Sequence, residues 1–251
     1  MPIDEDEVLH PPIVQSTYHI LHTRFLNISP LLRGAVWEYN IWNTHMHPMR
    51  SPSPSPASDT ALDYPYTAKT LDMKLQNKAA LQEELGWPVE PKRMLLCLPD
   101  GMTETLGGAL LMELLPGLAT LPVELVILGK GSAQYGNVLT QLAGKHRHRI
   151  AILPAQESAQ TRLLAAADAS LFLTDAGDLP ALPLALAYGA VPIALATRSL
   201  DDYNPNQESG NAFVFQTPTV WHAFAAAVRA LETYRFPFDW RTIQRHCMQE
   251  E

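Results

Sequence analysis

Cysteine and long apolar runs are scarce in this sequence. It has two cysteines, Cys97 and Cys247, which lie far apart, and its first seven residues are acidic rather than leader-like. Two distant thiols do not form a disulfide framework, so we expect a reduced, cytoplasmic setting. No uninterrupted apolar stretch reaches about 18 residues, and we therefore expect no membrane-spanning helix.

Positive charge is also in short supply. The chain has 18 Lys plus Arg against 26 Asp plus Glu, a formal net charge of -8, so no global basic field would attract nucleic acid or anionic lipid. The short basic run 145–149 has no aromatic neighbours, and we interpret it as a solvated turn near a helix C-terminus. Histidines near the N-terminus (His19, His22, His45 and His47) lack a third ligand at recognisable spacing, so we expect no metal site and no cofactor.

Proline, by contrast, is abundant, with 21 residues, and its placement indicates the domain organisation. Residues 51–58 alternate serine and proline, and such a segment forms neither a helix nor a paired strand because proline removes backbone donors. The residues before it show no clean period. We expect an irregular N-terminal arm over residues 1–60 and a folded domain over residues 61–251.

Strands and helices alternate in the rest of the chain. Apolar runs predict strands at 94–98, 123–128, 149–153, 170–173, 191–195 and 212–215. Helical patterns cover 64–86, 107–118, 135–143, 179–188 and 219–234. Strands alternating with helices of this length predict an α/β fold with a Rossmann-like, doubly wound parallel sheet.

Several motifs in this alternation belong together. Ala167-Asp168 closes a helix before a strand, Thr174-Asp175-Ala176 follows that strand, and Tyr188-Gly189 ends the next helix. With residues 77–86 (NKAALQEELG) and Trp42-Asn43, they resemble the C-terminal, sugar-nucleotide-binding domain of bacterial glycogen synthases and plant starch synthases. The resemblance implies a single lobe of a GT-B glycosyltransferase, truncated and degenerate, because the family's first lobe has no counterpart in the sequence.

The resemblance also implies functional positions, and three of these are changed. The family's Gly-Arg-Leu-x-x-Gln-Lys-Gly loop aligns with residues 100–107, where Gly101 replaces the arginine and Leu106 the lysine. The glutamate that contacts the sugar falls on Ala176. Charge develops on the departing diphosphate in the transition state, so two lost cations would cost about hundreds to tens of thousands-fold in rate. We therefore assign no catalytic residue.

Five residues remain as vestigial substrate-binding candidates. Gly129, Lys130 and Gly131 match the family's Leu-Gly-x-Gly turn, although any tight strand-to-helix turn uses glycine. Thr197 and Arg198 stand in the family's Thr-Gly-Gly loop with both glycines replaced. Arg198 is interpreted either as a substitute cation or as a solvated loop residue.

Two functional hypotheses follow. The first is a glycogen-synthase-like protein that has lost glucosyl transfer and serves as a binding, structural or assembly subunit, with a protein partner or a second copy over the face of the missing lobe. The second is an ADP-glucose-dependent glucosyltransferase lobe that acts weakly or completes its site with a separately encoded first lobe. ADP-glucose and glucan stay open as ligands.

Overall fold

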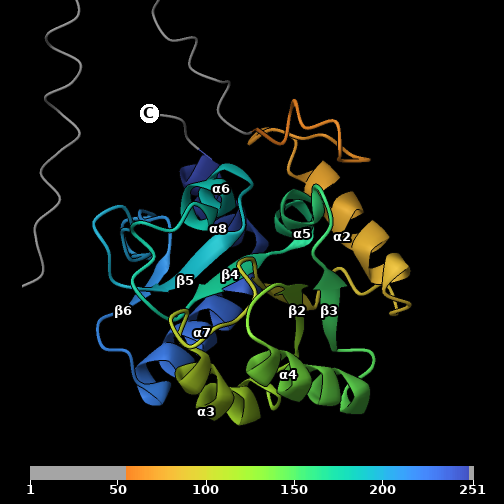
Figure 1. The fold of residues 1–251 in the computed structure, drawn as a ribbon. Coiled ribbons are helices and arrows are strands. Elements are labelled where there is room, and N and C mark those ends of the chain that lie inside the picture. The colour runs from red at the N-terminus through yellow and green to blue at the C-terminus, as the bar shows by residue number, and fades with distance from the viewer. Residues whose placement is uncertain (1–54, 249–251) are drawn as a thin grey trace, which may run out of the picture. The chain divides into compact units, whose positions relative to one another are not determined.

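The computed structural model describes residues 55–248. A six-stranded, entirely parallel sheet forms the centre of this part of the chain (Figure 1), with strand order β3-β2-β1-β4-β5-β6. The strands are β1 (Met94–Leu98), β2 (Val123–Gly129), β3 (Ile150–Pro154), β4 (Ala169–Phe172), β5 (Val191–Leu195) and β6 (Phe213–Phe215). The order reverses between β1 and β4, which confirms the predicted Rossmann-like, doubly wound topology.

Helices cover both faces of this sheet (Figure 1). They are α2 (Asp72–Glu84), α3 (Gly108–Leu118), α4 (Ala133–Lys145), α5 (Ala159–Ala166), α6 (Ala181–Ala187), α7 (Val220–Tyr234) and α8 (Pro237–Met248). One core cluster joins the sheet to α3, α4, α7 and α8, and a second joins it to α2, α5 and α6. The sheet is therefore buried on both sides.

Burial on two faces explains why the strands were readable from the sequence. All five residues of β1 are buried; Met94, Leu96 and Leu98 enter one core, while Leu95 and Cys97 enter the other. Successive side chains of a strand point to opposite faces, so a strand covered on both sides is apolar throughout.

The expected helix over 64–86 begins later than predicted, at Asp72. The segment before it contacts Tyr188, the residue that follows α6. The buried phenol of Tyr66 donates to the Tyr188 carbonyl at 2.7 Å, and the Tyr188 hydroxyl donates to Asp59 at 2.7 Å. Residues 59–66 are thus tied to the folded lobe, whereas residues 1–54, including most of the expected arm and Trp42-Asn43, lie outside the described residues.

Two buried lysines anchor α2. The Nζ atom of Lys78 lies 2.6 Å from Asp168 Oδ2, with both side chains almost fully buried. The Nζ atom of Lys74 donates to the carbonyls of Leu164, Ala165 and Tyr188 at 2.7, 3.1 and 2.9 Å. Burial lowers the pKa of Lys74 to about 7, against the opposing charge of Asp168.

Helix α8 was not predicted. Its buried residues Trp240, Ile243, Gln244 and Cys247 recur at helical spacing, and Pro237 occupies its first turn. That spacing is the signal that could have identified it. Within residues 55–248, none of the helices combines the length and apolarity needed to cross a membrane.

Candidate functional site

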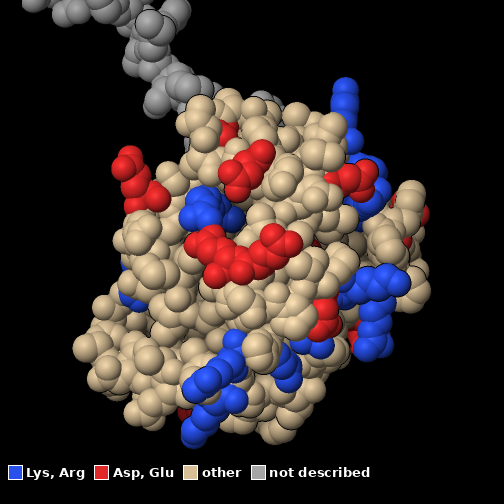
Figure 2. Space-filling model, turned by 90° about the vertical axis from the view of Figure 1, so that its right-hand side faces the viewer, with Lys and Arg blue, Asp and Glu red and all other residues tan. Residues whose placement is uncertain are grey.

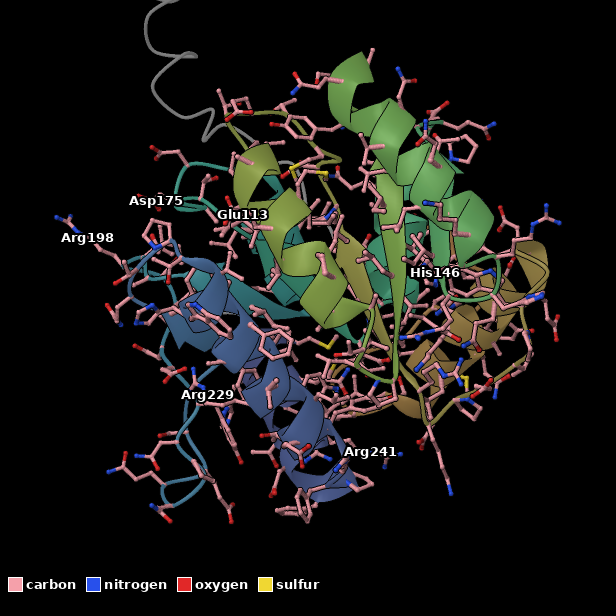
Figure 3. All side chains as sticks on the ribbon, turned by 90° about the horizontal axis from the view of Figure 1, so that it is seen from below. Glu113, His146, Asp175, Arg198, Arg229 and Arg241 are labelled. Atoms are coloured by element: carbon pink, nitrogen blue, oxygen red, sulfur yellow. The ribbon has the colours of Figure 1, made fainter. Side chains whose placement is uncertain are left out.

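Ligands of doubly wound sheets bind at the carboxyl ends of the strands, where the strand order reverses. In this structure that edge is formed by the loops that follow β1, β2, β4 and β5. Figure 3 shows Asp175 and Arg198 on neighbouring loops at this edge, with Glu113 on α3 nearby and Arg241 far away. The predicted site residues lie on two of these loops.

The turn Gly129-Lys130-Gly131 lies between β2 and α4 and is exposed. It lines a cavity of about 350 Å³. Apolar side chains from β2, β3 and α4 form the walls, and Ser132 and Thr140 add hydroxyl groups. Ser132 makes no side-chain cap to α4, so the first N–H groups of this helix open toward the same edge. Three of the five predicted residues therefore share one cavity.

The loop after β1 is joined to this turn by backbone hydrogen bonds. The Met102 amide donates to Lys130 O at 3.2 Å, and the Ser132 amide donates to Met102 O at 3.1 Å. Gly101 has φ +70°, and a Cβ there would overlap the Lys130 carbonyl; Gly131 has φ +116°, and its Cβ would overlap Met102 O. Only glycine permits both the backbone conformation and the close approach. Gly101, which the resemblance aligns with the family's arginine, is thus required by the loop's own packing.

A side-chain hydrogen bond also connects the loop after β1 to α4. The Tyr135 hydroxyl donates to the Glu104 carboxylate, and this bond, followed by burial, raises the pKa of Tyr135. The Tyr135 ring also covers Gly108, where a Cβ would overlap it. Sequence reasoning missed this pair, because it joins residues 31 positions apart.

The crevice between β1 and β4, where the strand order reverses, is almost closed. Its cavity measures about 20 Å³, room for about one water molecule. Leu106, Leu173 and Leu179 are among the side chains that fill it. Leu106, which the resemblance aligns with the family's lysine, therefore contributes packing rather than charge.

The loops after β4 and β5 bring other predicted residues together. Asp175 Oδ1 accepts the Gly177 amide at 3.0 Å, and a Cβ on Gly177 would lie 2.7 Å from Thr197 Oγ1. Ala176, which the resemblance aligns with the family's glutamate, is fully buried in the core. Arg198 is exposed and points outward in Figure 3. Thr197 and Arg198 are not among the residues lining the 350 Å³ cavity, so the five predicted residues separate into two groups.

Asp100, at the end of β1, is a residue that sequence reasoning missed. Gln160 donates to its Oδ1 at 3.2 Å, while its Oδ2 is buried without a hydrogen-bond partner among the described residues. Burial raises the pKa of Asp100, and the nearby Lys130 opposes this shift. An ionised carboxylate here would repel a diphosphate at the same edge.

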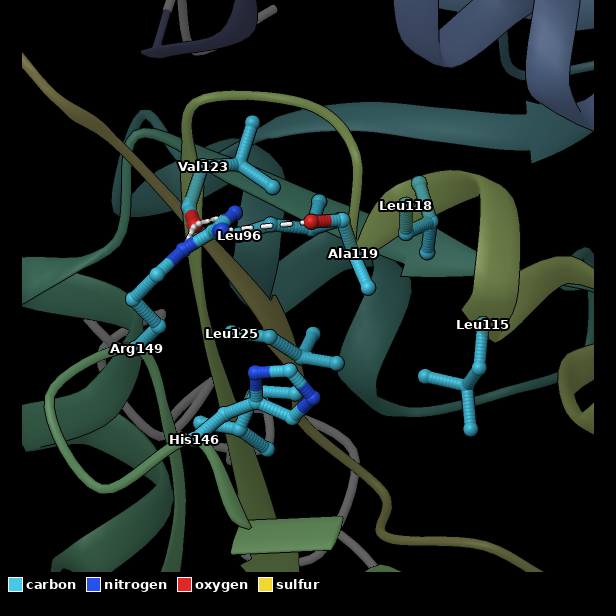
Figure 4. A pocket seen from close by; sticks show the side chains of 9 residues that line it. Leu96, Leu115, Leu118, Ala119, Val123, Leu125, His146 and Arg149 are labelled. Atoms are coloured by element: carbon cyan, nitrogen blue, oxygen red, sulfur yellow. Dashed lines mark hydrogen bonds between the residues drawn. The ribbon is translucent and has the colours of Figure 1, made fainter.

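The basic run 145–149 lies at the other end of α4. Lys145, Arg147 and His148 are exposed, as expected for a solvated turn. Arg149 differs: its guanidinium donates to the carbonyls of Ala119, Leu121 and Val123. Figure 4 shows this group beside His146 and the end of α3. The adjoining cavity of about 10 Å³ is too small for a ligand, so Arg149 is structural.

Metal ligands do not cluster in the described part. No group of three or more His, Cys, Asp or Glu side chains comes together within residues 55–248. The four N-terminal histidines discussed above lie outside that range. On the face drawn in Figure 2, acidic and basic side chains lie next to one another in several places.

Comparisons with known proteins agree with this geometry. The chain is 30% identical over 206 residues to glycogen synthase 1 of Synechocystis sp., covering 78% of this chain and 43% of that protein. It is 32% identical over 205 residues to the glycogen synthase of Gloeobacter violaceus, covering 78% and 44%. The chain is homologous to the C-terminal region of glycogen synthase. No protein-family model matches it.

Solved structures show the same fold. The catalytic domain of starch synthase IV from Arabidopsis thaliana, bound to ADP and acarbose, superposes with a TM-score of 0.68 at 23% identity, over 78% of this chain and 43% of that one. The described lobe is thus a Rossmann-like lobe of the GT-B type. The glycogen-synthase-like chain spans less than half the length of the curated relatives it matches.

Proposed function

We propose that this glycogen-synthase-like lobe does not transfer glucose and acts as a binding or assembly module. The observation that carries the proposal is the closed crevice between β1 and β4, with about 20 Å³ of space where a diphosphate would need to lie. The structural reason is local. Gly101 is held against Lys130 O, and Leu106 adds an apolar side chain where the resemblance places a cation.

The charge of the edge supports the same proposal. Lys130 is exposed beside Asp100, and Arg198 points away from the crevice (Figure 3). Transition-state stabilisation needs donors preorganised toward the developing charge. A single exposed lysine next to a carboxylate provides little stabilisation of the transition state.

The test is a transfer assay combined with calorimetry on the full chain. We expect no transfer of glucose from ADP-glucose to glycogen above the protein-free blank, and no binding of ADP-glucose below millimolar concentration. Transfer that disappears in the Lys130→Ala variant would refute the proposal. The Arg147→Ala variant, which removes an exposed basic residue away from this edge, is the matched control.

A second candidate function has its own observation. The 350 Å³ cavity beside Gly129-Lys130-Gly131 falls in the size range of about 300–1,000 Å³ that ligand sites occupy. It favours a nucleotide-binding lobe that a separately encoded first lobe would complete. Micromolar ADP binding that Lys130→Ala weakens would support this candidate over the first.

The assembly role predicts a partner at the same edge. Trp221 lies in the first turn of α7, directly after β6, and is 80% exposed. An exposed tryptophan of this kind is typical of protein interfaces. A second copy or a protein partner that covers it would be detected by light scattering of the wild type and of Trp221→Ala, and an unchanged monomeric mass in both would argue against self-association.

A further inference from the structure

A second large cavity lies away from the carboxyl edge of the sheet. It measures about 610 Å³ and lies between α2, the segment before β1, the end of α7 and α8. Asp168, which lines it, directly precedes β4, so the cavity opens at the amino ends of the strands. Figure 3 shows Arg241 of this cavity on α8, far from Asp175 and Arg198. We call it the amino-edge pocket.

We propose that the amino-edge pocket binds a small organic anion with an apolar body. Its volume suits a ligand of drug size, for which sites measure about 300–1,000 Å³. It is larger than the 350 Å³ cavity of the candidate nucleotide edge.

The walls of the pocket provide apolar contact. Leu71, Leu75, Pro91, Pro237 and Trp240 contribute to the lining. Leu75 is 37% exposed although it projects from a helix that packs on the core. An apolar ligand that covers such exposed surface removes it from water, and this favours binding.

Cations surround these walls. Lys92, Arg235 and Arg241 line the pocket and are exposed, in a chain whose formal net charge is -8. The one lining carboxylate, Asp168, is neutralised by Lys78 at 2.6 Å and accepts the Leu95 amide at 2.8 Å. The pocket therefore presents positive charge to a ligand and no unpaired acid.

The arginines are available for a ligand because their present partners are weak. Arg235 pairs with Glu232 and Arg241 pairs with Asp72, and all four side chains are well exposed. Exposed ion pairs are worth little in water. Lys92 forms no ion pair within the described residues. A carboxylate or phosphate held over apolar walls would make stronger, charge-assisted hydrogen bonds with the same groups.

The experiment uses anilinonaphthalene sulfonate, a fluorescent probe with an aromatic body and one anionic group. We expect saturable binding at one site per full-length chain, detected also as energy transfer from tryptophan. The Lys92→Gln/Arg241→Gln double variant should weaken binding about tenfold, because two charge-assisted contacts are lost and water weakens such contacts when the cations are exposed. Leu75→Glu should remove it, because the glutamate places a like charge on the wall.

Arg162→Gln is the matched control. Arg162 pairs with Glu84 and its side chain is 40% exposed, compared with 44% for Arg241, but it lies outside the pocket. We expect the Arg162→Gln variant to match the wild type in its affinity for the probe and in its thermal stability. The pocket variants should also be as stable as the wild type. Equal weakening in Arg162→Gln, or binding unchanged in the double variant, would overturn the proposal.

Competitors identify the natural chemistry. Displacement by dodecanoate favours an alkyl carboxylate, and displacement by naphthyl phosphate favours an aromatic phosphate ester. Displacement by neither would refute the anion site. Displacement of the probe by ADP that is lost in the Lys130→Ala variant would place the probe at the nucleotide edge and overturn the inference, because Lys130 lines the other cavity.

Discussion

The Tyr135 hydroxyl donates a hydrogen bond to the Glu104 carboxylate and thereby connects α4 to the loop after β1. Together with the backbone bonds between Met102 and the turn after β2, this contact holds the loop on both sides. These contacts restrain the loop. At the positions where the resemblance places the family's two cations, the residues present are therefore packed as well as uncharged.

The first prediction concerns restoring those cations. Gly101→Arg should lower the free energy of unfolding by about 2–5 kcal/mol, because a left-handed backbone and a close approach to Lys130 O both exclude a side chain. Leu106→Lys should cost about 1 kcal/mol, because a half-buried lysine can extend its amine to water. Urea unfolding measures both.

Gly101→Ala is the control for the arginine's bulk. Its single methyl group meets the same carbonyl, so it too should destabilise the chain. An alanine variant as stable as the wild type would mean that the loop can move. Gly136→Ala, on an open part of α4, should instead stabilise by about 0.5–1 kcal/mol.

The strands were predictable because β1, β2 and β5 are buried on both faces and are therefore apolar along nearly their whole length. The site was predictable only in part. The turn at Lys130 has a local glycine signal, whereas the roles of Asp100 and Tyr135 arise from contacts between segments far apart in the chain. Spacing within one segment carries no information about such contacts.

The second prediction concerns Arg149. Arg149→Met should destabilise the lobe by about 1.5–3 kcal/mol, because the carbonyls of Ala119, Leu121 and Val123 lose a charged donor. Arg147→Met, two residues away and exposed, should stay within about 0.5 kcal/mol of the wild type. Equal effects in thermal or urea unfolding would show that the guanidinium contacts contribute nothing.

The third prediction concerns the buried pair between α2 and β4. Lys78→Met should cost about 3–5 kcal/mol, because Asp168 is left buried without its cation. Adding Asp168→Asn should recover much of the loss, since the amide oxygen still accepts the Leu95 N–H and carries no charge. A double variant that is no more stable than Lys78→Met alone would show that the lost hydrogen bonds of the lysine to Pro91 O, Arg93 O and Tyr234 set the cost, and not the charge left on Asp168.

The fourth prediction concerns the two cysteines, both of which are buried and free. Burial raises the pKa of Cys247 from 9.0 to about 12, and it raises that of Cys97 further. Both native thiols therefore stay protonated at pH 8, so an aromatic disulfide reagent should label neither of them until the chain unfolds. Rapid labelling of the native chain at pH 8 would contradict the buried placement.

The same raised pKa values make the stability depend on pH, because the folded chain retains thiol protons that the unfolded chain releases. The thiols' contribution to stability is therefore complete below pH 9 and decreases as the pH rises from 9 to about 12. A Cys247→Ala/Cys97→Ala chain should lose less stability than the wild type between pH 9 and 10, whereas the buried tyrosines Tyr66, Tyr188 and Tyr234, whose pKa burial also raises, still reduce the stability of both chains at higher pH.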